Sequence, residues 1–305
     1  MNFKKLTARA ALNLAASHTW PPSSVLTVIY GSLLALFLGC EWSTLIFCAV
    51  LAISVLMQSA VNTLNDYHDF VKGTDTEDNS ADPTDAVLVY GQINPKSALQ
   101  LGIGFLVLAA LIGMLVVMKC GAAPLIVGLA GGVCVVAYSS GVFPLSYMPA
   151  GEVVSGFVMG GLIPLGVVAS FSGKLDFAVL LYSLPFMAGI SLIMLTNNTC
   201  DIERDRTAGR KTLGVMVGLT CSRWIYRIGA VFWLACVLFV GGWMFPEGAF
   251  ALPIGLCFGM TRIAAIFKAE LFPERRDAAM SDIIKANMFI NGSLAASLAA
   301  VLIFR

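Results

Sequence analysis

Long apolar runs separated by short polar stretches dominate the sequence. A helix needs roughly 20 apolar residues to cross the hydrocarbon core of a bilayer. Nine segments approach that length, namely residues 24–40, 44–61, 98–118, 123–140, 153–171, 177–195, 228–245, 249–267 and 286–304. The last is the weakest, because Asn287, Asn291 and Ser293 interrupt it. The pattern predicts an all-α integral membrane protein with nine transmembrane helices and a lipid bilayer as its surroundings.

The composition agrees with this pattern and narrows the chemistry. Of 305 residues, 58% are hydrophobic and only 12% are charged, far from the balance of a soluble domain. The net charge is +1, and we expect no nucleic-acid partner. His18 and His68 are the only two histidines, which excludes a metal site built from histidines. Any metal site must therefore use oxygen ligands.

The basic residues predict how the chain lies in the membrane, because lysine and arginine concentrate in cytoplasmic loops. With the N-terminus inside, the outer side holds only Lys119, Lys174 and Arg305. The inner side then holds the other basic residues: Lys4, Lys5, Arg9, Lys72, Lys96, Arg204, Arg206, Arg210, Lys211, Arg223, Arg227, Arg262, Lys268, Arg275, Arg276 and Lys285. We therefore expect a protein of the cytoplasmic membrane whose N-terminus is cytoplasmic and whose C-terminus is outside.

Two acidic stretches follow apolar runs at corresponding places in the chain. "NTLNDYHDFVKGTD" (residues 62–75) follows the second run, and "NNTCDIERDRTAGRKTL" (residues 197–213) follows the sixth. A shift of 132 residues places Asn65 on Asn197 and Asp69 on Asp201, and it also superimposes the first four runs on the next four. A repeat with an even number of spans keeps its orientation. Both stretches are thus expected on the cytoplasmic side.

This repeat defines the expected architecture. Residues 1–305 form a single membrane-embedded domain, built from repeat halves of about 20–150 and 151–275 and a ninth helix at 284–305. Each half is a four-helix bundle, and the two bundles surround a central cavity. The connections that carry the acids then meet at one end of that cavity.

Oxygen-bearing side chains recur at helical spacing within both stretches. If the second run continues as a helix, Asn65 and Asp69 share a face, as do Asn197, Asp201 and Asp205 in the other stretch. Mg²⁺ takes one or two carboxylates and leaves other positions to water and substrate phosphate. The neighbouring basic side chains would neutralise the remaining phosphate oxygens. Carboxylates, Mg²⁺ and basic residues together indicate a diphosphate site. The alternative is ordinary solvated helix ends with short-range ion pairs, which two matched copies disfavour.

At this point the sequence resembles a known family. The motifs N-D-Y-x-D-x-x-K-G-x-D and N-N-x-x-D-x-x-x-D-x-x-x-G-[RK]-x-T-L are similar to the paired aspartate motifs of the UbiA superfamily of intramembrane prenyltransferases. They resemble most the branch that prenylates 1,4-dihydroxy-2-naphthoate in menaquinone synthesis. The segment "AYSSGVFPLSYMPAGEVV" (residues 137–154) also resembles that branch.

The resemblance implies the substrates and the roles of individual residues. It implies a Mg²⁺-dependent enzyme, with two ions, that transfers a polyprenyl group from its diphosphate to an aromatic acceptor. The implied metal ligands are Asn65, Asp69, Asp75, Asn198, Asp201 and Asp205. The implied diphosphate-binding residues are Asn65, Asn198, Arg210 and Lys211. The implied catalytic residues are Asp69, Asp201, Asp205, Lys72 and Tyr138.

Two departures from the family pattern bear on the acceptor. Gly73 occupies the place of an aspartate in the commoner motif, and Asp75 substitutes for it, as in the naphthoate branch. That branch also has arginines just beyond the first motif, whereas residues 76–91 contain none. Another acceptor, such as 4-hydroxybenzoate or a homogentisate-like ring, therefore stays open.

Other classes of membrane protein fit the sequence less well. A secondary transporter would place ionisable groups near the bilayer midplane, yet the predicted spans are nearly free of charge. A phosphatidyl-transferase lacks its D-G-x-x-A-R signature here, and a haem or quinone carrier lacks the histidines. Aromatic side chains that could face the cavity and stabilise an allylic cation, or simply pack, are Phe157, Phe171, Phe186 and Tyr182.

Overall fold

The computed structural model describes residues 3–76, 86–141 and 144–304. Within these ranges all regular structure is helical, apart from one isolated β-bridge between Lys4 and Ile93. The α-helices are α1 (Ala8–Leu14), α2 (Leu26–Phe37), α3 (Thr44–Lys72), α4 (Val87–Gly91), α5 (Pro95–Cys120), α6 (Ala123–Ser139), α7 (Gly151–Gly156), α8 (Ile163–Ser172), α9 (Ala178–Tyr182), α10 (Leu184–Cys200), α11 (Ile202–Thr207), α12 (Leu213–Phe239), α13 (Ala251–Lys268) and α14 (Arg276–Phe304).

Seven helical stretches among the described residues are long and apolar enough to cross a membrane. They are Ser17–Phe37, Thr44–Lys72, Pro95–Cys120, Gly151–Ser172, Leu213–Met244, Ala251–Lys268 and Pro273–Phe304. Several of them join an α-helix to a short turn of π-helix, such as Phe157–Leu162 between α7 and α8. The apolar α6 and the helix α10, which carries the second acidic stretch, have 17 residues each. The prediction of an all-helical membrane protein is confirmed.

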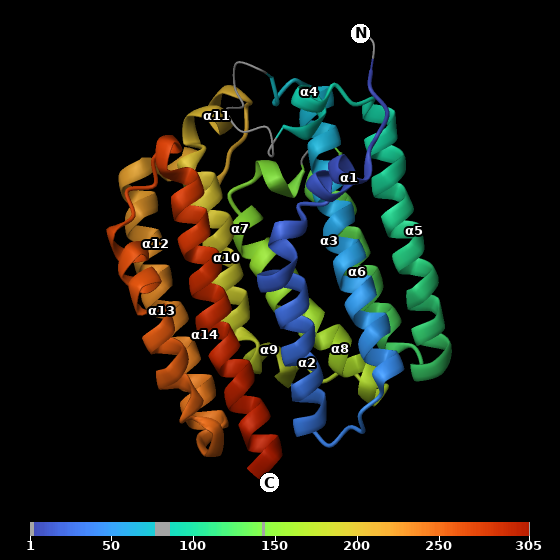
Figure 1. Cartoon of the computed structure of the whole chain (residues 1–305), viewed down its shortest axis with the longest axis vertical. Helices are drawn as coiled ribbons and strands as arrows, with labels where there is room; N and C mark the ends of the chain where they lie inside the picture. The colour runs from blue at the N-terminus through green and yellow to red at the C-terminus, as the bar shows by residue number, and fades with distance from the viewer. Residues whose placement is uncertain (1–2, 77–85, 142–143, 305) are drawn as a thin grey trace.

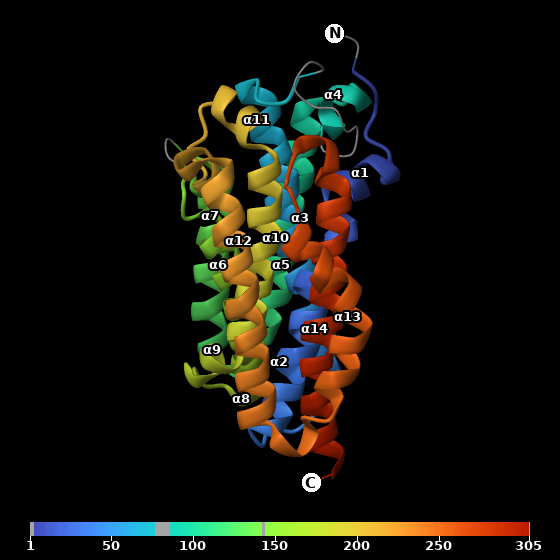
Figure 2. The ribbon, with the colours of Figure 1, turned by 90° about the vertical axis from the view of Figure 1, so that its left-hand side faces the viewer.

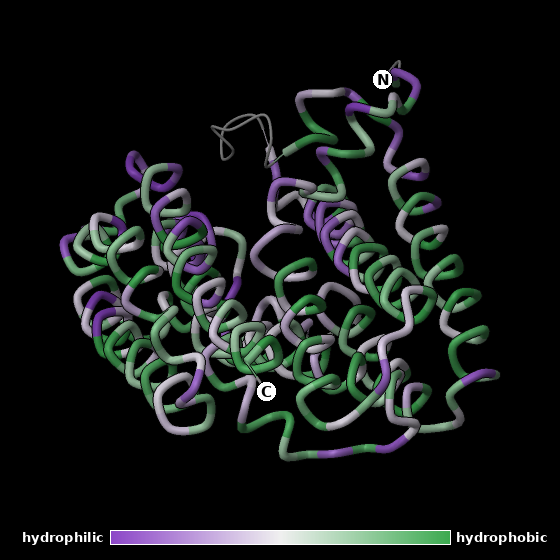
Figure 3. Tube along the Cα trace, turned by 60° about the horizontal axis from the view of Figure 1, so that its bottom comes forward, coloured by the Kyte–Doolittle hydropathy of each residue, from purple (hydrophilic) through white to green (hydrophobic). Residues whose placement is uncertain are grey.

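The helices lie side by side along the long axis of the molecule (Figures 1 and 2). The N-terminal segment, α4, α11 and the end of α3 gather at one end, and the C-terminus lies at the other (Figure 1). Apolar sequence runs along most of each long helix, as the green stretches of Figure 3 show. On α5, Leu111, Leu115 and Met118 are among the exposed large side chains. Such exposure fits a surface that faces lipid.

Capping residues set the bounds of the helix that carries the first acidic stretch. The Ser43 side chain accepts the backbone N–H of Ile46 at its start, as a favourable N-cap does. At its end Gly73 adopts φ 74°, the left-handed conformation that glycine accommodates best. The chain then turns back, and the N–H groups of Thr74 and Asp75 donate to the carbonyl of Asp69 at 2.9 and 3.3 Å. This turn brings Asp75 beside Asp69.

The amides that interrupt the last apolar run hold α14 in the core. Asn287 donates to the Gly189 carbonyl of α10 at 3.1 Å, and Asn291 donates to the Asn287 side chain at 3.0 Å. The indole N–H of Trp233 on α12 donates to Asn291 at 3.0 Å. All three side chains are buried. These groups therefore satisfy one another, as buried polar groups must.

The four aromatic residues considered for the cavity lie elsewhere. Phe186 is fully buried and stacks on Tyr30 at 4.5 Å between ring centroids. Tyr182 and Phe171 pack against the same core, and Phe157 is exposed. None of the four is among the described residues that line the cavity. The structure therefore supports a packing role for Phe171, Phe186 and Tyr182, whereas Phe157 lies on the surface.

Candidate active site

The first acidic stretch lies on the continuous helix α3, as its spacing predicted. Asn65 and Asp69 share a face, and the Asn65 Nδ2 donates to Asp69 Oδ2 at 2.8 Å. The Ser139 hydroxyl at the end of α6 donates to Asn65 Oδ1 at 3.0 Å. Asp69 and Asp75 are both buried. This wall of the site therefore presents two buried carboxylates and a fixed amide.

The second stretch is not one continuous helix. α10 ends at Cys200, and α11 begins at Ile202 after a break at Asp201. Backbone hydrogen bonds still run from Asp201 to Asn197 at 3.1 Å and from Asp205 to Asp201 at 2.8 Å. These three residues therefore stay linked through the backbone across the break, and all three line the cavity described below.

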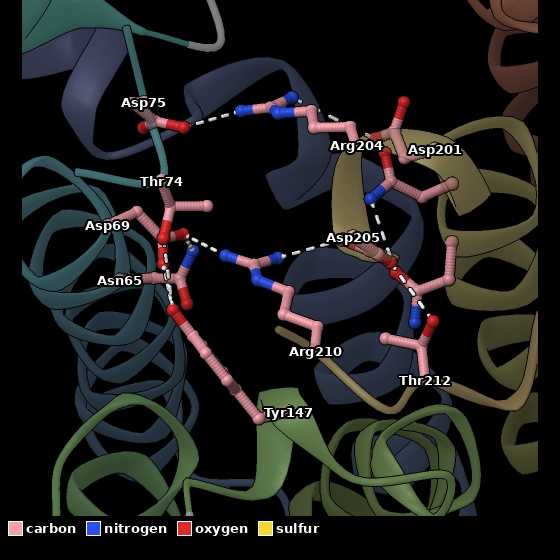
Figure 4. A network of polar contacts seen from close by, with 12 residues as sticks. Asn65, Asp69, Thr74, Asp75, Tyr147, Asp201, Arg204, Asp205, Arg210 and Thr212 are labelled. Atoms are coloured by element: carbon pink, nitrogen blue, oxygen red, sulfur yellow. Dashed lines mark hydrogen bonds and ion pairs between the residues drawn. The ribbon is translucent and has the colours of Figure 1, made fainter. Parts of the chain in front are cut away.

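Two arginines connect the two acidic stretches (Figure 4). Arg210 forms an ion pair with Asp69 and a second one with Asp205 at 3.5 Å. Arg204 pairs with Asp75 at 2.5 Å and approaches Asp201 at 3.9 Å. The four carboxylates thus lie on opposite sides of a central pair of guanidinium groups. Two stretches far apart in the sequence thus share one network of ion pairs.

A turn at a glycine positions Arg210, as the turn at Gly73 positions Asp75. Gly209 follows α11 with φ 73°, and the Arg210 N–H donates back to the Asp205 carbonyl at 2.8 Å. The Thr212 hydroxyl donates to the Asp205 carboxylate at 3.0 Å. Asp205 is therefore held by Arg210 and Thr212 together.

Tyr147 is a residue of the site that the sequence analysis did not assign. Its hydroxyl lies 3.1 Å from the Thr74 hydroxyl and 3.5 Å from Asp69 Oδ1. The Lys72 ammonium lies 4.5 Å from its ring centroid, and the Arg210 guanidinium carbon lies 4.9 Å from it. The ring thus holds two cations beside the acids. Its position in the segment that resembles the naphthoate branch was the one available signal.

Arg276, at the start of α14, was also missed except as a topology signal. Its Nη2 donates to Asn197 Oδ1 at 2.5 Å, and its Nε lies 3.2 Å from Asp201 Oδ2. Nothing in the sequence connects it to the second stretch, because 75 positions separate Asp201 from it. Only the packing of α14 against α10 brings them together.

Burial and the neighbouring guanidiniums shift the pKa values of the site in opposite directions. Desolvation raises the pKa of Asp205 to about 6, although Arg210 and Thr212 favour its charged form. Burial likewise raises the pKa of Asp75, against the effect of Arg204. For Arg210, burial alone would lower the pKa, but Asp69 and Asp205 more than offset it and the net shift is upward. An additional cation beside Asp75 and Asp205 would therefore favour the ionised form of these carboxyl groups.

These groups line a cavity of about 300 Å³. Polar lining residues include Asn62, Asn65, Asp66, Asp69, Asp75, Asn197, Asn198, Asp201, Arg204, Asp205, Arg210 and Arg276. The apolar lining includes Val135, Val154, Val158, Met159, Ile190, Ile193, Met194, Met280 and Ile284. A polar head and an apolar wall in one cavity suit an amphipathic ligand.

Most, but not all, of the predicted site residues meet at this cavity. Every predicted metal ligand lines it, and so does Tyr138. Lys72 is exposed and reaches the site only through the Tyr147 ring. Lys211 is also exposed, and its backbone N–H donates to the Tyr147 carbonyl at 2.9 Å. The segment without arginines includes residues 77–85, which lie outside the described residues.

Comparison with known proteins identifies the family. A model described as the UbiA prenyltransferase family matches residues 24–292. The chain belongs to this family. It is 33% identical over 205 residues to 1,4-dihydroxy-2-naphthoate octaprenyltransferase of Bacillus subtilis, a match covering 67% of this chain and 65% of the relative. The match thus spans just under two thirds of that relative's length.

Two further relatives match over more of their length. The protein of Mycobacterium tuberculosis with the same name is 27% identical over 283 residues, covering 90% of this chain and 93% of the relative. UbiA prenyltransferase domain-containing protein 1 of Mus musculus is 29% identical over 279 residues, covering 86% and 75%.

Solved structures of UbiA homologues share the fold. A UbiA homologue from Archaeoglobus fulgidus superimposes with a TM-score of 0.69 at 14% identity, over 96% of this chain and 99% of that one. The structure of this homologue bound to DMAPP and Mg²⁺ gives a TM-score of 0.57 over the same shares. At this identity the likeness concerns the fold alone.

Proposed function

We propose that this protein transfers a polyprenyl group from an allylic diphosphate to an aromatic acceptor in a Mg²⁺-dependent reaction. One observation carries the proposal: carboxylates from the two acidic stretches pair with Arg204 and Arg210 in a cavity that apolar side chains also line. A diphosphate carries the charge that these arginines would bind, and a prenyl chain would fill the apolar part. The family and the names of the relatives support the same reaction.

The donor set fits Mg²⁺. Carboxylate and amide oxygens are the ligands that this ion prefers, with substrate phosphate completing the shell. Among the described residues, no three acidic, histidine or cysteine side chains converge on one point. Two ions, each bound by few protein ligands and by the diphosphate, therefore suit the site better than one protein cage. The proposed ligands are Asn65, Asp69 and Asp75 on one wall and Asn198, Asp201 and Asp205 on the other.

Binding of the diphosphate would change the partners of the arginines. Arg204 and Arg210 each neutralise two acids in the structure. Guanidiniums also bind phosphate oxygens well, often with two parallel hydrogen bonds. When bound, Mg²⁺ supplies positive charge that stabilises the diphosphate leaving group as the allylic C–O bond breaks. Arg210, with Arg276 at the other wall, then donates hydrogen bonds where negative charge develops, which is where such donors accelerate a reaction most.

The apolar wall protects the reactive carbon. An allylic cation is trapped by water unless the site is dry, and side chains such as Val158, Met159, Ile193 and Met194 exclude water from the cavity. Tyr138 lines the same cavity and can hold the cation or the acceptor ring in place. The chain's own part in the carbon–carbon bond formation is therefore to orient two substrates and keep them dry.

We propose 1,4-dihydroxy-2-naphthoate as the acceptor, giving demethylmenaquinone. The motif pattern supports this choice, and so do the two relatives named for that substrate. The absence of arginines in residues 76–91 is the sequence feature against it. The acceptor therefore has to be tested directly beside 4-hydroxybenzoate.

We further propose that α6 and the α9–α10 pair also cross the membrane, which gives nine spans in two repeated halves. Both have apolar sequence, and both run alongside the longer helices in Figure 1. The acidic end carries the N-terminus and many of the basic residues, which supports a cytoplasmic location for that end. The C-terminus would then lie outside.

The test is turnover by purified protein in detergent. Farnesyl diphosphate is supplied with either acceptor, in Mg²⁺ or in EDTA, and prenylated product and released diphosphate are measured. Mg²⁺-dependent prenylation of the naphthoate alone supports the whole proposal. Prenylation of 4-hydroxybenzoate alone keeps the reaction and rejects the acceptor. No consumption of the diphosphate rejects the reaction and favours a transporter.

The two motifs are tested by Asp69→Ala and Asp201→Ala. Each should reduce turnover to the background while the protein still purifies as a folded monodisperse species. Glu203→Gln is the matched control, because Glu203 is exposed and pairs only locally with Arg206. Full activity in either alanine variant would contradict the assigned roles.

A further inference from the structure

A third acidic group lies behind the second motif, outside both acidic stretches. Glu152 is in the first turn of α7, and only 3% of its surface is exposed. It is not among the described residues that line the cavity. Its Oε1 accepts a hydrogen bond from Asn198 Nδ2 at 2.9 Å. Glu152 thus contacts a residue that lines the cavity without lining it itself.

The other groups near the Glu152 side chain also treat it as a hydrogen-bond acceptor. The backbone N–H groups of Glu152 and Leu213 also interact with this carboxylate. Its Oε2 is buried without a hydrogen-bond partner among the described residues. A buried acceptor left open in this way reduces stability. Packing alone therefore does not explain why a glutamate occupies this buried position.

The contact decides which way the Asn198 amide points. An amide has an oxygen that only accepts and a nitrogen that only donates, and a carboxylate only accepts. With Glu152 on one side, Asn198 must turn its nitrogen toward Glu152 and its oxygen away from it. Asn197 Nδ2 donates to Asn198 Oδ1 at 3.4 Å, which fits the same orientation of the amide.

We infer that Glu152 is a positioning residue that fixes the Asn198 amide with its oxygen toward the cavity, where that oxygen can bind a divalent cation. The inference rests on the proposed function, because it concerns a ligand of the proposed metal site. Residues behind metal ligands commonly act in this way, and changing one reduces metal affinity by about 10- to 100-fold. In the first motif the Asn65 amide donates to Asp69 and accepts from the Ser139 hydroxyl, so in the described part of the chain its partner from outside the motif is a hydroxyl and not a carboxylate.

The experiment measures Mn²⁺ binding in the absence of prenyl transfer. Purified protein in detergent with inorganic diphosphate is titrated with Mn²⁺, and free Mn²⁺ is followed by electron paramagnetic resonance. Glu152→Gln keeps the size of the side chain but offers both a donor and an acceptor, so Asn198 can be held either way round. We expect Mn²⁺ affinity to fall by about 10- to 100-fold. Glu203→Gln removes an exposed charge from α11 and should leave it unchanged.

A second variant separates orientation from simple loss of packing. Asn198→Asp places an oxygen on both sides of the side chain, so its orientation no longer matters. In the combined variant Glu152→Gln/Asn198→Asp, the introduced amide can donate to one of these two oxygens. This variant should therefore recover most of the lost affinity. Melting curves of all variants check that each is folded.

The outcomes distinguish this inference from the proposed function. Wild-type protein that binds no Mn²⁺ in the presence of diphosphate overturns the metal site and the inference with it. Wild-type binding with equal affinity in Glu152→Gln leaves the proposed function standing and overturns the inference. A loss in Glu152→Gln that Asn198→Asp does not recover shows a structural role and also overturns it.

Discussion

The Arg210→Gln variant tests whether one guanidinium holds the two halves of the site together. Arg210 is 14% exposed and pairs with two carboxylates that are 6% and 4% exposed, Asp69 and Asp205. Glutamine keeps some length and polarity but removes the charge. Both acids then lose their cation while remaining buried.

The expected loss of stability follows from that burial. Removing one partner of a buried ion pair destabilises a protein by about 3–5 kcal/mol, because a charge is left uncompensated. Here Asp69 keeps its hydrogen bond from Asn65 at 2.8 Å, and Asp205 keeps the one from Thr212 at 3.0 Å. These remaining donors place the expected loss near the lower limit, at about 3 kcal/mol.

The free energy of unfolding is measured in mixed micelles by tryptophan fluorescence, where the buried Trp233 reports on the core. Arg210→Gln is combined with Asp69→Asn in a double-mutant cycle. The double variant removes one of the two unpaired charges, and we expect a coupling energy of about 1–2 kcal/mol. Arg206→Gln is the control, because the exposed pair with Glu203 contributes at most about 1 kcal/mol.

Additive effects in this cycle would refute the reasoning. A coupling energy near zero means that Arg210 and Asp69 do not interact in the folded protein. A loss in Arg210→Gln no larger than that in Arg206→Gln means that the site is open to water.

Three other predictions follow from individual contacts. Gly189→Ala places a Cβ against Asn287 Oδ1 in a clash, so unfolding measurements should show a loss of about 1–3 kcal/mol, whereas Gly292→Ala, in open space, should be neutral. Tyr147→Phe keeps the ring and removes the hydroxyl, so kcat should fall by about 2- to 10-fold, and an unchanged kcat would show the hydroxyl to be dispensable. Because burial raises the pKa of Asp205 from 3.8 to about 6, the folded state binds its proton more tightly. The stability that this proton contributes is lost as pH rises through about 6, and Asp205→Asn should flatten that part of the pH curve; equal curves would contradict the pKa shift.

Local rules account for much of the fold and for part of the site. The apolar runs predicted most bounds of the long helices within a few residues, but three helices extend well beyond their runs into polar sequence. α3 continues to Lys72, α14 begins at Arg276, and α12 begins at Leu213, well before the run at 228–245. The first half of α12 contains polar and charged residues such as Arg223 and Arg227, so a search for apolar runs does not detect it. The spacing of Asn65 and Asp69 correctly placed them on one face of α3, because a helix fixes neighbours four residues apart.

The second stretch has a break that its four-residue spacing did not indicate. α10 stops at Cys200 and α11 restarts at Ile202, although backbone hydrogen bonds still link Asn197, Asp201 and Asp205 and all three line the cavity. Arg204 lies three positions further along the chain and 3.9 Å from Asp201, whereas Arg276 approaches Asp201 from the separate helix α14 at 3.2 Å. Contacts of this kind outweigh weak local propensities and are invisible to a periodic pattern.

The sequence by itself determined that the chain is a helical membrane protein with two acidic stretches at corresponding places, since apolar length and residue spacing are local properties. The tertiary structure alone decided which charges meet: Arg210 with Asp69, and Arg276 with Asp201. It also placed Glu152 behind Asn198 and Tyr147 between two cations. These contacts join residues that lie from 46 to 141 positions apart in the sequence, so they depend on how the helices pack. No local preference encodes that packing, because it arises from the shapes of all the helix surfaces together.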